Sequence, residues 1–455
     1  MQTACTTNLS GHGKSGRSFN DMKIPLSKMT ISPIKRLNGE IRVQGDKSVS
    51  HRAIILGSIA KGVTNVTNFL PSDDCRATMN AFRAMGVSIE DINGGTVKIE
   101  GRNIHGLTEP ADVLDMGNSG TSARLLCGLL AGQNFFSVMT GDSSLRRRPM
   151  KRVTGPLRGM GANITGRRDG DLLPLAIKGG ELQGIHHRLP VASAQVKSAL
   201  LFAGLYARGK TSVEEMPQSR DHTERMLTYF GIKLGKEGNV ITIESGQKLT
   251  ARDISVPGDI SSAAFFMVGA SILKGSEVIV RDVGLNPTRT GIIDVLRKMG
   301  ALIEIIDLRD SEGEPVGDVR VVSAPLKGTE ISGEIIPRLV DELPVICIAA
   351  AVAEGETLIK DAAELRVKES DRIAVMAECL TLMGVEVETF NDGMRITGGR
   401  QLKGTVCNSH GDHRIAMSMA IAGLVADDEM VIEDTECIKT SFPEFEKTLR
   451  QLSVV

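Results

Sequence analysis

The sequence repeats one pattern about every 70 residues, and this repeat restricts the possible folds more than any other feature. Each unit opens with a turn marked by Gly or Pro and continues into an apolar run with helical spacing, such as residues 199–204. A short strand and a second helix follow. The second helix ends in Met-Gly or Phe-Gly, where the glycine suits a left-handed C-cap. Six units of strand–helix–strand–helix–strand–strand fit, the last one cut short near Leu452. The openings are expected at Gly45, Gly117, Pro190, Pro257, Pro337 and Gly411, and the helix ends at Met85-Gly86, Met160-Gly161, Phe230-Gly231, Met299-Gly300 and Met383-Gly384.

The length of the chain indicates how these units are grouped. A single hydrophobic core rarely serves more than roughly 250–300 residues, and the chain has 455. Six units therefore predict two α/β lobes of three units each. We expect a flexible N-terminal tail over 1–27, an N-terminal lobe over 45–256, and a C-terminal lobe made from 28–44 and 257–455. The strand expected near 31–43 has no unit of its own, so it is assigned to the second lobe.

Composition and charge exclude several classes of function. The formal net charge is -1, which disfavours a general nucleic-acid surface. Aromatic residues make up 3% and there is no Trp, which disfavours base-stacking platforms. No apolar run approaches the 18 residues of a membrane span. The seven cysteines are scattered and form no CxxC pair, which predicts reduced thiols in a cytoplasmic protein without a zinc site.

Charged residues gather at the openings of the repeated units. Lys47, Ser48 and Arg52 lie at the start of the first helix, and Arg414 lies at the start of the last unit. Helix N-termini attract anions, and arginine forks bind carboxylate and phosphate through two hydrogen bonds. Each cation alone is best explained as a solvated surface charge, and Asp46 could be a simple N-cap. Their recurrence at equivalent openings nevertheless predicts a site for a small polyanionic substrate.

Four motifs in the expected order resemble one known family. Residues 45–52, 117–121, 365–372 and 412–417 resemble the signatures of the enolpyruvyl transferases in their shikimate-pathway form, and the similarity runs from about residue 31 to the C-terminus. The resemblance implies an inverse α/β barrel in each lobe, three βαβαββ repeats per lobe, and an active site in the cleft between the lobes. The implied reaction joins shikimate 3-phosphate and phosphoenolpyruvate with release of phosphate. No metal or organic cofactor is implied.

The resemblance also implies roles for individual residues. The reaction needs a base near the target hydroxyl and an acid near C3 of phosphoenolpyruvate. Asp341 is the candidate base and Glu369 the candidate acid, with Lys47 assisting, although the two carboxylates could exchange these roles. Neighbouring cations would lower the pKa of both carboxyls, whereas burial would raise it, and the sequence leaves the balance open. Phosphoenolpyruvate would be bound by Lys47, Gly120, Arg148, Gln195, Arg372 and Arg414, and shikimate 3-phosphate by Lys47, Ser48, Arg52, Ser193, Gln195, Arg220, Asp341 and Lys368, with Arg124 a weaker candidate.

Two positions depart from the pattern of many family members. Ala194 follows Ser193 where many members carry a second serine. Thr440 stands directly before Ser441-Phe442-Pro443, where many members have lysine. The second departure resembles the divergent second class of the family, whose members often resist the herbicide glyphosate. Gly120 is the position at which an added methyl group would narrow the phosphoenolpyruvate pocket.

Three other functions compete with this interpretation. The sister enzyme that transfers enolpyruvyl to UDP-N-acetylglucosamine normally has a reactive cysteine in a loop that corresponds to residues 141–145, and none is present there. An RNA-end-processing enzyme of related architecture would need a basic track. A non-catalytic anion-binding homologue would have no reason to keep both Asp341 and Glu369. We also expect a monomer whose partners are small-molecule substrates, with no nucleic acid or membrane.

Overall fold

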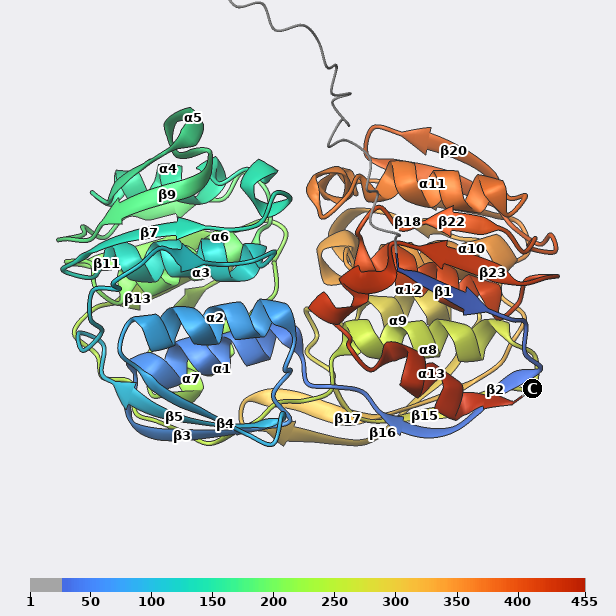
Figure 1. The fold of residues 1–455 in the computed structure, drawn as a ribbon, viewed down its shortest axis with the longest axis horizontal. Coiled ribbons are helices and arrows are strands. Elements are labelled where there is room, and N and C mark those ends of the chain that lie inside the picture. The colour runs from blue at the N-terminus through green and yellow to red at the C-terminus, as the bar shows by residue number, and fades with distance from the viewer. Residues whose placement is uncertain (1–26, 455) are drawn as a thin grey trace, which may run out of the picture.

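The computed structural model describes residues 27–454 and places the six repeated units in two lobes (Figure 1). The predicted flexible tail over 1–27 lies outside the described residues except for Ser27. The strands of residues 27–454 form six sheets, and each sheet has one parallel pair of strands while its other pairings are antiparallel. The repeat predicted from the sequence is therefore a structural repeat.

The N-terminal lobe contains three four-stranded sheets and their helices. The sheets have the orders β14-β3-β5-β4, β6-β7-β9-β8 and β10-β11-β13-β12. The strands are β3 (Lys61–Thr67), β4 (Ser88–Ile92), β5 (Thr96–Arg102), β6 (Leu114–Asp115), β7 (Phe136–Thr140), β8 (Asn163–Gly166), β9 (Leu172–Lys178), β10 (His186–Arg188), β11 (Lys210–Glu214), β12 (Gly235–Glu237), β13 (Val240–Glu244) and β14 (Ile254–Ser255). The helices are α1 (Lys47–Ile59), α2 (Asp73–Ala84), α3 (Gly120–Ala131), η1 (Leu145–Arg147), α4 (Lys151–Gly159), α5 (Arg167–Gly170), α6 (Ala194–Gly204) and α7 (His222–Tyr229).

The C-terminal lobe repeats this plan with two strands taken from the beginning of the chain. Its sheets have the orders β16-β17-β15-β2-β24, β18-β19-β21-β20 and β1-β23-β22. The strands are β1 (Lys28–Ile31), β2 (Arg36–Arg42), β15 (Glu277–Gly284), β16 (Leu302–Ser311), β17 (Glu314–Val322), β18 (Glu330–Ile331), β19 (Glu356–Ile359), β20 (Glu386–Phe390), β21 (Gly393–Thr397), β22 (Val406–Asn408), β23 (Met430–Glu433) and β24 (Ser453–Val454). The helices are α8 (Ile260–Ile272), α9 (Gly291–Lys298), η2 (Gly333–Arg338), α10 (Leu343–Val352), η3 (Ala363–Val367), α11 (Arg372–Leu382), α12 (His413–Gly423), η4 (Thr435–Thr440) and α13 (Phe445–Leu452).

Burial explains why the helices lie inside and the sheets outside. The first helix of each unit buries most of its residues, and α8 buries nearly every one, as a helix at the centre of a core must. Strands such as β7 and β9 alternate between buried and more exposed positions, so one face of each sheet meets solvent. This arrangement is the inverse α/β barrel expected from the sequence. No helix within residues 27–454 is long and apolar enough to cross a membrane.

The second helices end as predicted. Met85, Met160, Phe230, Met299 and Met383 are the C-cap residues of α2, α4, α7, α9 and α11. The glycine after each of them has φ between +84° and +101°, a conformation that a residue with a Cβ rarely adopts.

Two boundaries differ from the prediction. The strand expected over 31–43 is two strands, β1 and β2, because Pro33 lies between them and cannot donate to a sheet. The helix expected after Pro337 begins later, at Leu343, and Pro337 lies within the 3₁₀ helix η2. As a result, Asp341 stands directly before the N-cap residue Glu342.

The core is divided in the same way as the sheets. One buried apolar cluster runs from Val49 to Val256, and the other joins Met29–Val43 to residues 260–452. Where the chain crosses between them, Asp46 N donates to Pro257 O (2.7 Å) and Asp259 N donates to Gln44 O (2.9 Å). These observations support the division that we propose, with lobes over 45–256 and over 28–44 plus 257–455.

Candidate active site

A cleft lies where the first helices of both lobes begin. Helices α1, α3 and α6 start on one side, and helices such as α12 start on the other. Their first turns are capped by side chains at the predicted openings: Asp46 accepts from Val49 N (2.9 Å), and Asp412 accepts from Arg414 N (2.9 Å). All residues predicted for the site line this one cleft, namely Lys47, Ser48, Arg52, Gly120, Arg148, Ser193, Gln195, Arg220, Asp341, Lys368, Glu369, Arg372 and Arg414.

The N-terminal wall of the cleft holds its cations in place through neutral and acidic partners. Lys47 Nζ lies 3.1 Å from Asp74 Oδ2, and burial lowers the pKa of Lys47 less than Asp74 and Glu369 raise it. Arg148 Nη2 donates to Asn118 Oδ1 (2.6 Å). Arg124 Nη1 donates to Gln195 Oε1 (2.7 Å), so these two predicted residues contact each other. The wall therefore presents positive charge that is already oriented.

Arg52 points into the N-terminal lobe, although it also lines the cleft. Its guanidinium donates to Thr223 Oγ1 (2.6 Å), Ser198 Oγ (3.0 Å) and the backbone oxygen of Ser48 (2.9 Å). All three acceptors are neutral, and burial lowers the pKa of Arg52 to about 10. Thr223 and Ser198 were not predicted from the sequence, because hydroxyl residues at these positions resemble ordinary helix residues.

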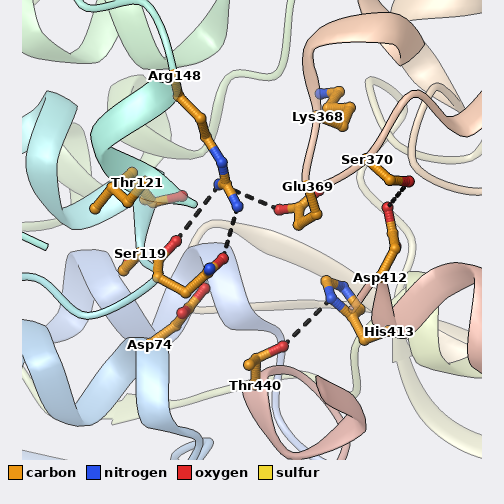
Figure 2. Close-up of polar contacts among 12 residues, drawn as sticks. Asp74, Ser119, Thr121, Arg148, Lys368, Glu369, Ser370, Asp412, His413 and Thr440 are labelled. Atoms are coloured by element: carbon orange, nitrogen blue, oxygen red, sulfur yellow. Dashed lines mark hydrogen bonds and ion pairs between the residues drawn. The ribbon is translucent and has the colours of Figure 1, made fainter. Parts of the chain in front are cut away.

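The C-terminal wall contributes the two candidate catalytic carboxylates. Glu369 Oε2 lies 2.6 Å from Arg372 Nη2, and Glu369 Oε1 lies 3.4 Å from Arg148 Nη1 across the cleft (Figure 2). Asp341 Oδ2 lies 2.6 Å from Arg220 Nη2, which also belongs to the opposite wall. Arg414 Nη1 donates to the backbone oxygen of Asp341 (2.9 Å). Each carboxylate thus pairs with a cation from each lobe. Arg372 is a C-terminal partner of both, and the N-terminal partner is Arg148 for Glu369 and Arg220 for Asp341.

The structure decides the balance that the sequence left open. Burial raises the pKa of both carboxyls, but the surrounding cations have the larger combined effect. Arg220 and Lys368 hold the pKa of Asp341 well below its usual range, and Arg372 and Arg148 do the same for Glu369. Both groups are therefore carboxylates at neutral pH.

Arg372 is the most deeply buried cation of the site. It is 1% exposed and donates through Nε to Asp412 Oδ2 (2.8 Å). Asp412 therefore both caps α12 and fixes Arg372, a role that its motif alone did not indicate. Because its guanidinium also contacts Glu369 and Asp341, Arg372 holds three carboxylates in one cluster.

Sequence reasoning missed one central residue, Arg289. It is 2% exposed and lies at the crossing between the lobes. Its guanidinium contacts Asp46 Oδ2 (3.3 Å) and Asp259 Oδ1 (3.4 Å), which cap α1 and α8. Glu342 at the N-cap of α10 lies 3.7 Å away. One arginine among 54 basic residues carries no signal for such a position.

The residues available for a metal do not form a site. Within residues 27–454, no group of three or more His, Cys, Asp or Glu side chains could hold an ion. His413 lines the cleft, but burial and Lys47 lower its pKa to about 3.

Comparisons with known proteins are consistent with this geometry. The model of the EPSP synthase family, described as 3-phosphoshikimate 1-carboxyvinyltransferase, matches residues 31–449. This chain belongs to the EPSP synthase family. The 3-phosphoshikimate 1-carboxyvinyltransferase of Citrifermentans bemidjiense is 58% identical over 420 residues, which cover 92% of this chain and 98% of that protein. The protein of the same name from Desulforudis audaxviator is 57% identical over 424 residues, or 93% and 99% of the two chains.

The fold agrees with solved members of the EPSP synthase family. An EPSP synthase structure from Acinetobacter baumannii has a TM-score of 0.85 and 49% identity, and the match covers 94% of this chain and 98% of that one. The family resemblance found in the four motifs is thereby confirmed. The alternative functions, including transfer to UDP-N-acetylglucosamine and a non-catalytic homologue, are not favoured.

Proposed function

We propose that the cleft transfers the enolpyruvyl group of phosphoenolpyruvate to the 5-hydroxyl of shikimate 3-phosphate and releases phosphate. This is the shikimate-pathway reaction of the EPSP synthase family, to which the chain belongs. The observation that supports the assignment most strongly is the pairing of Asp341 and Glu369 with cations from both walls of one cleft. Two phosphorylated substrates need this density of positive charge, and the reaction needs two groups that exchange protons.

The reaction proceeds by addition and elimination. Asp341 accepts the proton of the 5-hydroxyl while the hydroxyl oxygen bonds to C2 of phosphoenolpyruvate. At the same time, C3 gains a proton from Glu369. In the resulting tetrahedral intermediate, C3 then returns a proton to Glu369, the C2–C3 double bond reforms, and the C2–O bond to phosphate breaks. Glu369 must be protonated before it donates, and its low pKa results largely from Arg372 and Arg148. Phosphate and carboxylate groups of the substrates would neutralise such cations and raise that pKa.

The remaining residues bind the two substrates. We assign phosphoenolpyruvate to Lys47, Gly120, Arg148, Gln195, Arg372 and Arg414, and shikimate 3-phosphate to Lys47, Ser48, Arg52, Ser193, Gln195, Arg220, Asp341 and Lys368. Their common place in the cleft supports this assignment. Arg52 would act from inside the N-terminal lobe, where its hydrogen bond to the backbone oxygen of Ser48 orients the first turn of α1.

The oligomeric state and the cellular location are proposed from the site and from the cysteines. Every predicted site residue comes from a single chain, which supports a monomer that needs no second copy to complete the site. The cysteines within residues 27–454 are free thiols, which supports a reducing, cytoplasmic setting. Membership of the divergent second class stays a prediction.

The function is tested by following phosphate release. We expect release when shikimate 3-phosphate and phosphoenolpyruvate are supplied together, and none when UDP-N-acetylglucosamine replaces shikimate 3-phosphate. A product with the mass of enolpyruvylshikimate 3-phosphate should accumulate with the phosphate. Phosphate release with phosphoenolpyruvate and UDP-N-acetylglucosamine, but not with phosphoenolpyruvate and shikimate 3-phosphate, would contradict the proposal.

A methyl group at Gly120 should weaken phosphoenolpyruvate binding selectively. A Cβ at this position would lie 3.0 Å from Arg124 Nη1 and 3.3 Å from Arg148 Nη1, so both guanidinium groups must shift. Loss of roughly one charge-assisted hydrogen bond corresponds to about a tenfold rise in KM for phosphoenolpyruvate in Gly120→Ala. Steady-state kinetics should show little change in KM for shikimate 3-phosphate. Gly155→Ala is the matched control, because no atom lies within 4 Å of its added Cβ.

A further inference from the structure

The hydroxyl of Thr440 donates its proton in one hydrogen bond, to a backbone oxygen. Thr440 is the last residue of η4, and its Oγ1 lies 2.7 Å from the backbone oxygen of Cys437. A carbonyl oxygen can only accept, so at this distance the hydroxyl must donate to it. The lone pairs of Oγ1 are then the part of Thr440 that remains for other partners.

The second contact of Thr440 is with His413, the first residue of α12. Thr440 Oγ1 lies 3.3 Å from His413 Nδ1, as drawn in Figure 2. Since the hydroxyl proton is already used, the proton in this contact must come from the ring, which makes Nδ1 the protonated nitrogen. In a neutral imidazole the other nitrogen, Nε2, is then an acceptor. The low pKa of His413 supports the neutral form at pH 7.

The acceptor nitrogen of His413 has no partner among the described residues. His413 is 3% exposed and lines the cleft, and its Nε2 is buried without a hydrogen bond. Neighbouring Asp412 does not supply the ring with a partner. Its oxygens instead accept from Arg372 Nε (2.8 Å), Ser370 Oγ (3.0 Å) and Arg414 N (2.9 Å). The ring is therefore oriented by Thr440 and not by an adjacent carboxylate.

Lys47 is the group that matches this acceptor. Both side chains line the same cleft, and among charged groups Lys47 has the largest effect on the pKa of His413. Among the described residues its only side-chain hydrogen-bond partner is Asp74, and an ammonium carries three protons, so donors remain. Glu369 lines the same cleft and raises the pKa of both Lys47 and His413.

We propose that Thr440 is a positioning residue that fixes His413 as the Nδ1–H tautomer, so that Nε2 is kept as an acceptor to which the ammonium of Lys47 can donate. The inference rests on the proposed function, because it concerns how the candidate catalytic lysine is oriented. The opposite tautomer would turn an N–H toward the ammonium and repel it. Thr440, His413 and Lys47 belong to η4, α12 and α1, so a hydrogen bond between His413 and Lys47 would join both walls of the cleft.

The tautomer can be measured without turnover. In the full chain labelled with ¹⁵N-histidine, two-bond correlation spectra assign the proton to Nδ1 or Nε2, and His413→Gln identifies the signals among those of eight histidines. We expect Nδ1–H and no titration between pH 6 and 8. Thr440→Val, which keeps the shape but removes the oxygen, should move the proton to Nε2 in a large fraction of molecules, whereas Thr440→Ser should restore the wild-type spectrum.

Kinetics supply the second readout. Loss of one hydrogen bond to a charged group predicts about a tenfold fall in kcat for Thr440→Val, with recovery in Thr440→Ser and little change in KM for shikimate 3-phosphate. Thr448→Val is the matched control, since Thr448 Oγ1 also donates to a backbone oxygen (Glu444 O, 2.9 Å) but lies in α13. An Nε2–H tautomer in the wild type, an unchanged tautomer in Thr440→Val, or an unchanged kcat in that variant would overturn the proposal. Failure of the proposed function alone would abolish turnover and leave the tautomer result intact.

Discussion

Replacing Glu369 by glutamine is expected to lower kcat by about 10²–10⁴-fold, the range typical for loss of a general acid. Glutamine keeps the size of the side chain and can still accept from Arg372 Nη2, which lies 2.6 Å from Glu369 in the wild type. The KM for phosphoenolpyruvate should not rise, because Arg148 loses a carboxylate that competes with the substrate. Steady-state kinetics with both substrates measure this split between kcat and KM.

The control for this variant is Glu364→Gln. Glu364 also pairs across the cleft, with Arg152 Nη1 at 2.9 Å, but both side chains are more than one third exposed. Such a pair contributes little to stability, and its loss should change kcat by less than about twofold. Equal losses in the two variants would mean that Glu369 acts only as an ion-pair partner between the lobes.

The ion pairs of Glu369 predict a pH dependence of stability, which Glu369→Gln can test. The folded-state pKa of Glu369 lies well below the ordinary value of 4.5, so its ion pairs stabilise the fold fully above that value and are lost as pH falls through the folded pKa. Below the folded pKa the wild-type side chain is a neutral acid that resembles glutamine. Thermal unfolding should therefore show wild type more stable than Glu369→Gln at pH 7, with the difference shrinking as the pH falls below about 4. A constant difference down to strongly acidic pH would contradict the assigned ion pairs.

Replacing Arg289 by methionine is expected to destabilise the fold by about 3–5 kcal/mol, the cost of leaving buried carboxylates without their partner. Asp46, Asp259 and Glu342 would remain together at the crossing between the lobes. Arg281→Met is the matched control. Arg281 also bridges two acids, Glu40 (2.7 Å) and Asp318 (2.6 Å), but 30% of its side chain is exposed, so a much smaller loss of stability is expected.

Acid should partly rescue Arg289→Met. Without the guanidinium, burial and mutual repulsion raise the pKa of Asp46 and Asp259 above their unfolded values. The folded variant then binds more protons than its unfolded chain, so its stability falls as pH rises through this range. Unfolding at pH 5 and pH 8 should show a larger deficit relative to wild type at pH 8. A deficit independent of pH would indicate lost packing as the main effect.

Much of the fold followed from the periodic pattern of the sequence. Local signals such as Met85-Gly86 and Met383-Gly384 act within one helix end, so they could be interpreted without knowledge of distant residues. The convergence of Lys47 and Arg414 was also predictable, because equivalent openings of repeated units come to equivalent places in the fold.

The remaining features depend on partners that are far apart in the sequence. Arg289 meets Asp46 across 243 positions, and nothing near Arg289 distinguishes it from a surface cation. Arg52 was predicted as a cleft residue, but its inward hydrogen bonds depend on Ser198 and Thr223 from other helices. The late start of α10 reflects a 3₁₀ turn over Pro337, which local pattern alone does not separate from a helix start.

The pairing of the first two strands has a consequence for synthesis on the ribosome. The sheets of the N-terminal lobe use only strands between Lys61 and Ser255, so their partners are all translated early. Strand β2 must wait for β15 and β24, and β1 must wait for β23 at Met430–Glu433. At about 5–20 residues per second, the wait for β23 lasts tens of seconds. Strands β1 and β2, which are translated before the other strands described here, are thus among the last to find their places, and until then their unpaired edges are available to chaperones.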